Sequence, residues 1–352
     1  MLDPAGDGAV IKVEACGICG TDVHIYMGQT SGKSPFPLIL GHEVAGTITA
    51  VGKNFGGVDS VGAPVGEGDR IFVAPGVSCG FCYKCSVLEV PTRCLNKKAY
   101  GFTPNPDQWP HLTGGYAEYM HVFIPHSLFF KTTVPAEVAT LIEPYSIALH
   151  GLDKAQIQPG DTVAVQGSGA IGLLTLVGAK KCGASKVIVL GAPEGRLKLA
   201  KQLGADLVVD ITRVPLPERV EMVRKETPAG LGADVVLECA GQPAAVAEGL
   251  ELLRDGGRFV ELGNFTDNGE TSLNPFRHMV SKNNAIYGVW GALPKHLVRA
   301  LWLIEQDPAT YRTIVSHTVP LAQVGEIFEA LSEQYSFNGQ DVIKAVVVPT
   351  SD

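Results

Sequence analysis

The 352-residue sequence lacks several features that mark whole classes of protein. No apolar run reaches the roughly 18 residues that a membrane-spanning helix needs. The first residues, MLDPAGDGAV, lack the basic start and apolar stretch of a secretory signal. Basic residues form no cluster, and 28 Lys and Arg against 36 Asp and Glu give a net charge of -8. We therefore expect a cytoplasmic protein that binds neither a membrane nor a nucleic acid.

A disulfide framework is also not expected, although the sequence has eight cysteines. The chain is long, it carries no secretory signal, and four of the cysteines have the spacing of metal ligands, which together favour a reducing compartment. There is no internal repeat and no low-complexity segment. A chain of this length, 45% hydrophobic, is expected to form about two domains with separate cores.

The pattern of the sequence changes near residue 160. Before it, short apolar segments broken by Gly and Pro, as in VIKVEAC and VAGTITAVG, predict a closed or strongly bent β structure. From Asp161, apolar β-branched segments alternate with helical ones, which predicts a parallel, doubly wound sheet. After a helix at roughly 294–306, short β segments predict a return to the first domain. The expected domains are therefore 1–144 and 145–290, with 291–352 rejoining the first.

A glycine-rich loop in VAVQGSGAIGLL follows a predicted strand and opens a predicted helix. Its glycines have the G-x-G-x-x-G spacing, which allows a tight turn, a close approach to a pyrophosphate, and close packing of helix and strand. The helix N-terminus offers N–H groups to the anion. The loop residues expected to contact a dinucleotide are Gly167, Gly169, Ala170, Ile171 and Gly172.

The sequence indicates the choice between NAD and NADP less clearly than it indicates the dinucleotide loop. The strand VIVL should end near an Asp or Glu that binds the ribose 2′-OH, but the residue there is Gly191. Glu194 or Arg196 is a possible substitute contact, and the prediction is NAD with NADP still possible. Cys239 and Gly263 follow other sheet strands, where cofactor contacts gather.

Four cysteines lie close together in CGFCYKCSVLEVPTRC, with the spacing C-x2-C-x2-C-x8-C. Four thiolates on one loop satisfy the closed, tetrahedral coordination of a structural zinc, which we favour over an iron centre. The predicted ligands are Cys79, Cys82, Cys85 and Cys94. Because such a site has no open position, it is expected to fold a lobe and not to catalyse.

A second set of donors is spread over ACGICGTDVH, GHEVAG and LIEPYSIALHG. A catalytic zinc takes three protein ligands and leaves one position open. The candidates are Cys19, His42, Glu43 and Glu143. Each alone is consistent with a core thiol, a loop histidine or a helix-starting acid, but together they predict a catalytic zinc. Whether Glu43 or Glu143 is the third ligand stays open.

These motifs, together with GGYAEY, resemble in order and over nearly the whole chain the zinc-containing medium-chain alcohol dehydrogenases. TDVHIY is most similar to the L-threonine dehydrogenase branch, and EPYSIALHG to the sorbitol and polyol branch. The resemblance implies an α/β fold, with a Rossmann doubly wound parallel sheet plus a GroES-like β-rich catalytic domain that carries a structural-zinc lobe. It also implies an active site in the cleft between the domains, two zinc ions per chain, and a homodimer or homotetramer.

The resemblance further implies hydride transfer between a secondary alcohol or polyol and NAD or NADP, giving a ketone. The positions matching the ligands of the catalytic zinc are Cys19, His42, and Glu43 or Glu143. Thr21 matches the hydroxyl that hydrogen-bonds the substrate oxygen, His24 lies further along the proton relay, and Asp22 is expected to orient the segment. Lys344 resembles a basic residue that reaches the pyrophosphate, but a solvated strand charge is equally consistent.

Several features depart from the family pattern. The last cysteine gap is one residue longer than expected, and the family's early β-hairpin is missing, so the start is either truncated or built differently. Cys16 is interpreted as a core thiol near the site. Trp109, Tyr145 and Trp290 either line a substrate pocket or pack in a core or interface.

Three alternatives to a polyol-type dehydrogenase are consistent with parts of the sequence. The first is an activity like that of L-threonine 3-dehydrogenase. The second is a non-catalytic binding protein of the same fold, against which the intact donor set argues. The third is a metal-handling or redox-sensing protein built on the cysteine loop, which would leave the glycine loop unexplained.

Overall fold

The structure is a computed structural model of the whole chain. It describes residues 6, 8–29, 38–102, 113–122 and 127–349. The chain divides into two compact units: unit 1 is Met1–Glu143 with Leu293–Asp352, and unit 2 is Pro144–Ala292. None of the described helices has the length and hydrophobicity of a membrane-spanning segment.

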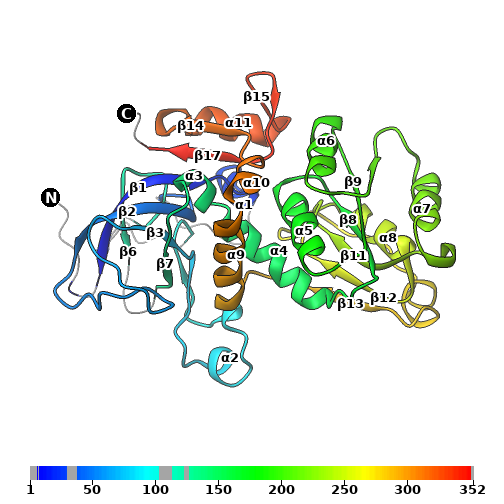
Figure 1. Cartoon of the computed structure of the whole chain (residues 1–352), viewed down its shortest axis with the longest axis horizontal. Helices are drawn as coiled ribbons and strands as arrows, with labels where there is room; N and C mark the ends of the chain where they lie inside the picture. The colour runs from blue at the N-terminus through cyan, green and yellow to red at the C-terminus, as the bar shows by residue number, and fades with distance from the viewer. Residues whose placement is uncertain (1–5, 7, 30–37, 103–112, 123–126, 350–352) are drawn as a thin grey trace. The chain divides into compact units, whose positions relative to one another are not determined.

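Unit 1 contains a seven-stranded sheet in the order β14-β17-β1-β2-β3-β7, with β6 also paired to β1. Its strands are β1 (Ala9–Gly17), β2 (Glu43–Val51), β3 (Arg70–Val73), β6 (Tyr119–Val122), β7 (Phe129–Lys131), β14 (His317–Pro320) and β17 (Ala345–Val348). The last strand, β17, lies antiparallel beside the first, with Cys16 opposite Val347 (Figure 1). Residues from the end of the chain therefore reach the strand that leads into the predicted catalytic segment.

Shorter elements surround this sheet. They are α1 (Gly20–Tyr26), β4 (Gly76–Val77), α2 (Tyr83–Ser86), η1 (Pro91–Arg93), β5 (Lys98–Ala99), α3 (Ala136–Ala139), α9 (Pro294–Gln306), α10 (Pro308–Arg312), η4 (Leu321–Gln323), α11 (Val324–Glu333), β15 (Ser336–Phe337) and β16 (Gln340–Asp341). The predicted helix at roughly 294–306 is α9. One core cluster of unit 1 joins apolar residues of β1, β2 and β3, among them Ile11, Val44 and Ile71, and burial of these side chains stabilises the sheet.

Unit 2 contains a six-stranded sheet in the order β10-β9-β8-β11-β12-β13, and every pairing in it is parallel. Its elements are β8 (Thr162–Gln166), α5 (Ala170–Lys181), β9 (Lys186–Gly191), α6 (Glu194–Gln202), β10 (Leu207–Asp210), α7 (Leu216–Lys225), η2 (Pro228–Gly230), β11 (Ala233–Glu238), α8 (Pro243–Leu252), β12 (Leu253–Glu261), η3 (Phe276–Val280) and β13 (Ala285–Gly288). The boundary between the units along the chain, after Glu143, falls in the first turn of helix α4 (Ile142–Ala155). The predicted doubly wound parallel sheet is confirmed.

The strand order of unit 2 reverses at β8. Strand β8 has β9 on one side and β11 on the other, so the chain moves outward in both directions from it. In sheets of this kind, ligands bind beyond the carboxyl ends of the strands at this switch point. At this edge Gln166 lies opposite Glu238, and Glu238 lies opposite Glu261. The glycine-rich loop leaves β8 at the same edge.

Candidate metal centres and cofactor loop

Three donor residues come together at the start of α1 and of β2. Cys19 is the N-cap residue of α1, His42 immediately precedes β2, and Glu43 is the first residue of that strand. The ligand atoms of these residues all lie within 4.8 Å of one another. The set combines one thiolate, one imidazole and one carboxylate, which matches the donor chemistry of a catalytic zinc.

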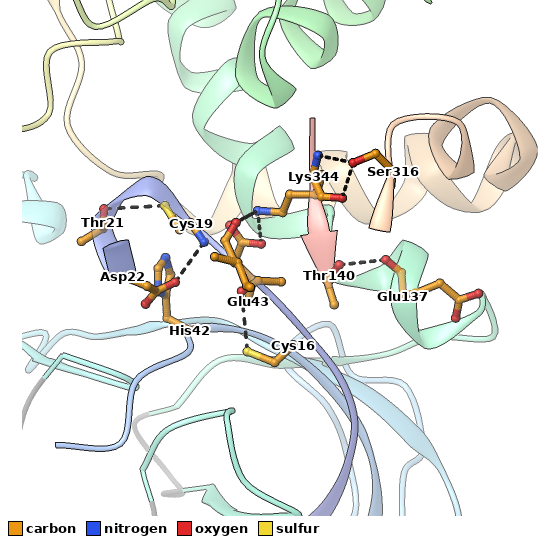
Figure 2. A network of polar contacts seen from close by, with 12 residues as sticks. Cys16, Cys19, Thr21, Asp22, His42, Glu43, Glu137, Thr140, Ser316 and Lys344 are labelled. Carbon is orange, nitrogen blue, oxygen red and sulfur yellow. Dashed lines mark hydrogen bonds and ion pairs between the residues drawn. The ribbon is translucent and has the colours of Figure 1, made fainter. Parts of the chain in front are cut away.

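Asp22 holds both Cys19 and His42 in place, as the sequence interpretation expected of an orienting residue. Its carboxylate accepts a hydrogen bond from the Cys19 backbone N–H at 2.9 Å and lies 3.2 Å from Nδ1 of His42 (Figure 2). The Tyr116 hydroxyl donates to the same carboxylate at 2.8 Å. Burial alone would raise the pKa of Asp22, but His42 and these donors lower it below its usual value.

Glu43 is paired with a cation from the other end of the chain. Nζ of Lys344 donates to Oε1 of Glu43 at 2.6 Å and to the Ile18 carbonyl oxygen at 2.8 Å (Figure 2). Oε2 of Glu43 lies 2.5 Å from the same nitrogen, outside hydrogen-bond geometry. Both side chains are buried, and although burial lowers the pKa of Lys344, the charge of Glu43 raises it overall. The predicted contact of Lys344 with a pyrophosphate stays a prediction.

The other predicted catalytic residues lie on α1 and α4. The Cys19 thiol donates to the Thr21 hydroxyl at 3.6 Å, and His24, one helical turn further on, has Nδ1 2.9 Å from Oε1 of Gln29. Glu143 lies in the first turn of α4 and is outside the group whose donor atoms lie within 4.8 Å of one another. Burial raises the pKa of its carboxyl to about 7, with His42 acting against that rise and Glu43 adding to it.

Cys16 lies beneath the same group. Its thiol is fully buried and accepts a hydrogen bond from the Glu43 backbone N–H. Burial raises the pKa of this thiol well above its usual value, so it stays protonated. Only glycine fits at the neighbouring position 17, because a Cβ atom on Gly17 would overlap the carboxylate of Glu43.

The four cysteines of the second motif gather on the loop around α2. None of the four is disulfide-bonded, and their sulfur atoms lie within 4.8 Å of one another. The sulfurs of Cys82 and Cys85 are 3.4 Å apart, those of Cys79 and Cys94 3.5 Å, and those of Cys82 and Cys94 3.9 Å. A tetrahedral zinc with bonds of about 2.3 Å separates its sulfur ligands by about 3.8 Å. The cluster therefore has the dimensions of a zinc site.

Backbone N–H groups aimed at the sulfurs favour thiolates in this loop. Burial acts to raise the pKa of Cys79, but N–H groups of Phe81 and Cys82 lower it to about 6. Burial and hydrogen bonds with Cys82 and Cys94 raise the pKa of Cys85 to about 12. Thiols this close together resist losing all their protons, and a divalent cation bound among them would displace the protons that remain.

The glycine-rich loop of unit 2 has the backbone geometry that its spacing predicts. Gly167 has a φ of +102°, and a Cβ atom at Gly172 would overlap the Gly167 carbonyl oxygen. At Gly169, the N-cap of α5, a Cβ atom would have no described atom within 4 Å. The first and third glycines are thus required by the fold, whereas the second borders space at a helix N-terminus suited to a phosphate.

The remaining predicted cofactor residues lie along the carboxyl edge of the sheet or just beyond it. A Cβ atom at Gly191 would lie 2.5 Å from Oγ of Ser168, so the loop leaves no room there for the expected acid. Arg196 is half-buried in α6. Cys239 lies 3.6 Å from the Thr175 hydroxyl, and burial raises the pKa of its thiol. Gly263 packs directly against the carboxylate of Glu238.

The three aromatic residues proposed for a substrate pocket differ in their surroundings. Tyr145 is fully buried, Trp290 is exposed, and Trp109 lies outside the described residues.

Comparisons with known proteins agree with this geometry. Residues 5–133 match the alcohol dehydrogenase GroES-like domain, and residues 170–306 match the zinc-binding dehydrogenase family. Sorbitol dehydrogenase of Bacillus subtilis (strain 168) is 34% identical over 289 residues, which are 81% of this chain and 75% of that protein. The chain belongs to the zinc-dependent alcohol dehydrogenase family. It is an NAD(P)-linked alcohol oxidoreductase with the two-domain fold of that family.

Solved structures of relatives have the same fold as this dehydrogenase. An alcohol dehydrogenase from Thermotoga maritima superposes with a TM-score of 0.92 at 30% identity, covering 99% of this chain and 94% of that one. A zinc-binding dehydrogenase from Sinorhizobium meliloti 1021, bound to NADP, has a TM-score of 0.84 at 31% identity, with the same coverage.

Two partners of this dehydrogenase's donor set were missed by the sequence interpretation. Lys344 is predicted to be either a pyrophosphate contact or a solvated strand charge, and Tyr116 enters the prediction only as part of GGYAEY. Both reach the donor set through side-chain contacts across large sequence separations, 301 residues for Lys344 to Glu43 and 94 for Tyr116 to Asp22. The one sequence signal for an ion pair is the position of this lysine in the apolar segment VIKAVVVP, because a lysine buried in a strand needs a carboxylate partner.

Proposed function

We propose that this dehydrogenase binds two zinc ions per chain and oxidises a secondary alcohol or polyol to a ketone, with NAD as the hydride acceptor. The observation that carries the proposal is the convergence of one thiol, one imidazole and one carboxylate within 4.8 Å. A separate set of four sulfurs with tetrahedral spacing supports the second ion.

The residues at the first site fit a catalytic zinc. Nδ1 of His42 is engaged by Asp22, so Nε2 is the nitrogen available to a metal, in the carboxylate–histidine–metal arrangement that fixes the tautomer. Cys19 supplies the thiolate and Glu43 a carboxylate, with Glu143 as the alternative third ligand. When bound, zinc supplies a Lewis acid that lowers the pKa of the alcohol hydroxyl.

The chain's own residues then handle the proton. Thr21 places a hydroxyl 3.6 Å from the Cys19 sulfur, where it accepts the proton of the substrate oxygen and passes it on. His24 lies three residues further along α1, hence on the same helical face, and is the proposed exit to solvent. Asp22 and Tyr116 keep this segment fixed through their hydrogen bonds.

The substrate class is supported by similarity. Sorbitol dehydrogenase, whose name denotes a polyol substrate, covers most of this chain. A panel of polyols, simple secondary alcohols and L-threonine, each tested with NAD and with NADP, distinguishes the polyol proposal from the L-threonine alternative. Turnover of L-threonine alone would overturn the polyol assignment.

A cytoplasmic location, suggested by the sequence, remains a prediction.

We also propose a homo-oligomer, which an open sheet edge supports. Strand β13 ends the strand order of unit 2, and η3, which leads into it, exposes Phe276 and Val280. Open edges and exposed apolar groups are features that a second copy of a chain covers.

The two zinc sites can be tested by separating them. His42→Ala and Cys19→Ala each remove a ligand of the first site only, so metal analysis should fall from two zinc ions per chain to about one, and turnover should be lost. Cys182→Ala is the matched control, because Cys182 is an exposed thiol outside both clusters. Full activity in His42→Ala, or an unchanged zinc content, would show that the first site is misassigned.

A further inference from the structure

Two carboxyl groups face each other at the carboxyl edge of the sheet in unit 2. Glu238 ends β11 and Glu261 ends β12, and the two residues are direct partners in the parallel register. Partners in register point to the same face of a sheet. Glu238 is fully buried, and its carboxyl is within hydrogen-bonding reach of the Glu261 carboxyl.

Each carboxyl holds the loop that follows its own strand. Oε1 of Glu238 accepts the backbone N–H groups of Ala240 at 2.7 Å and Gly241 at 3.0 Å. Oε1 of Glu261 accepts the backbone N–H of Asn264 at 2.9 Å and its amide at 3.2 Å. The Asn264 amide also lies 3.5 Å from Oε2 of Glu238, so it bridges the two acids.

The two loops also touch directly. Gly241 has a φ of +69°, and a Cβ atom there would lie 2.6 Å from the Gly263 carbonyl oxygen. A Cβ atom at Gly263 would overlap both the Glu238 carboxylate and the Gly241 nitrogen. A small separation of the two carboxyl groups must therefore move both loops.

The arrangement needs one proton. Oε2 of Glu261 is buried and has no hydrogen-bond donor among the described residues, so a proton between the two acids would satisfy it. Burial together with the hydrogen bond and charge of Glu261 raises the pKa of Glu238 to about 8. The neighbours that face the pair are Gln166 of β8, the Cys239 thiol and Asn264, and none of them supplies a positive charge.

We propose that Glu238 and Glu261 share one proton and act as positioning residues, which hold the 239–241 and 263–264 loops in the arrangement that receives the nicotinamide cofactor. The inference rests on the proposed function, because these loops lie at the edge where a sheet of this order binds a dinucleotide. Loss of the proton to solvent leaves two adjacent carboxylates, whose repulsion separates the loops.

The sign of the pH effect follows from this arrangement. Below pH 8 most of the protein carries the shared proton, and the 239–241 and 263–264 loops are held together. Above pH 8 an increasing fraction of the protein has lost this proton. If only the protonated form binds, the Kd for the cofactor rises about tenfold between pH 7 and pH 9. Binding takes up a proton in the same range, because only the protonated form binds the cofactor.

The test is a titration of the zinc-loaded enzyme with NADH and with NADPH, followed by cofactor fluorescence from pH 6.5 to 9.5. Glu238→Gln and Glu261→Gln replace the shared proton with a permanent amide N–H. Each variant should show a flat profile and bind the cofactor about tenfold more tightly than the wild type at pH 9. Glu248→Gln is the matched control, since Glu248 is another buried acid with a raised pKa but pairs with Arg219 between α7 and α8. It should keep the wild-type profile.

A flat wild-type profile between pH 7 and 9 would overturn the inference, as would glutamine variants that keep the wild-type slope. Binding of neither NADH nor NADPH at any pH would instead defeat the proposed function. If the variants fold poorly, infrared spectroscopy decides on a background of Glu143→Gln with Glu248→Gln, which removes the other two carboxyls of raised pKa. In that background a protonated carboxyl band must be present at pH 7 and lost by pH 9.5. Absence of that band at pH 7 also overturns the inference.

Discussion

Glu43, one of the three donors, and Lys344 are buried together, with 0% and 4% of their surfaces exposed. An ion pair in such surroundings contributes little beyond an apolar pair, but removing one partner leaves a buried charge without compensation. The only other hydrogen bond of the Lys344 amine among the described residues goes to the Ile18 carbonyl oxygen. The stability of this region therefore depends on both residues being present.

Replacing Lys344 by Met is expected to destabilise the metal-free protein by about 3 to 5 kcal/mol, because the Glu43 carboxylate loses its counter-charge. Urea denaturation in the presence of a chelator measures this loss. Lys131→Met is the control, because Lys131 pairs with Asp69 at 2.8 Å while both side chains are about one-third exposed. Such a pair is worth less than about 1 kcal/mol.

Added zinc gives the same variant a second outcome. If Glu43 is the third zinc ligand, bound zinc supplies the missing positive charge and restores part of the stability lost in Lys344→Met. If Glu143 is the ligand, zinc is near the Glu43 carboxylate without being bonded to it, so it restores less of the lost stability. Equal stability of Lys344→Met and Lys131→Met without metal would contradict the importance assigned to the buried pair.

How far the sequence predicted the site depended on how local each contact is. Cys19, His42 and Glu43 lie in two short motifs, and the resemblance of those motifs to a known family was enough to propose them as ligands. The capping interaction of Asp22 is also local, and its role was expected. For Lys344 a cofactor contact and a solvated strand charge were equally consistent with the sequence, because no local pattern identifies the partner of a basic residue on a strand.

At the scale of single elements, the turn from β8 into α5 separates glycines that the fold requires from one that a ligand requires. Gly172→Ala brings a methyl group onto the Gly167 carbonyl oxygen, so we expect unit 2 to be destabilised. Gly169→Ala meets no described atom within 4 Å, so we expect normal stability. Its methyl group should nevertheless weaken cofactor binding about tenfold or more, because the pyrophosphate backbone contact needs that space.

Thermal unfolding and cofactor titration of both variants check this pair of outcomes. Gly195→Ala is the control, since position 195 also lacks neighbours within 4 Å but lies within α6. Unchanged cofactor affinity in a well-folded Gly169→Ala would place the pyrophosphate away from this loop.

The elements themselves were largely predictable. The buried strands β8, β9 and β11 are short and apolar, and each is followed by a helical segment, so their pattern has few alternatives. The pairing of the acids at the ends of β11 and β12 was not predicted. It depends on the register of the two strands, which places Glu238 opposite Glu261 and which the sequence alone does not specify. The cysteine spacing predicted which sulfurs gather. It did not predict that backbone N–H groups lower the pKa of Cys79 while burial and neighbouring thiols raise that of Cys85.

At the scale of the whole molecule, the proposed homo-oligomer depends on one face of unit 2. Strand β13 stands at the end of the sheet, and Ile286 and Tyr287 on it are 37% and 36% exposed. Phe276 and Val280 of η3 are more exposed still, at 71% and 72%. An unpaired edge beside exposed apolar side chains is a liability for a single chain, and pairing with a second copy removes it.

We expect the wild type to elute as an oligomer of the 37.2 kDa chain, and Ile286→Lys and Phe276→Lys to shift it to a single chain. A lysine at either position would place like charges at the proposed contact between copies, which costs more than the lost apolar burial alone. Size-exclusion chromatography with light scattering measures the mass directly. Leu231→Lys is the control, because Leu231 is 63% exposed in unit 2 but lies outside both η3 and β13. If Leu231→Lys dissociates the oligomer as readily as Ile286→Lys does, charge alone is the cause and this edge is not the interface.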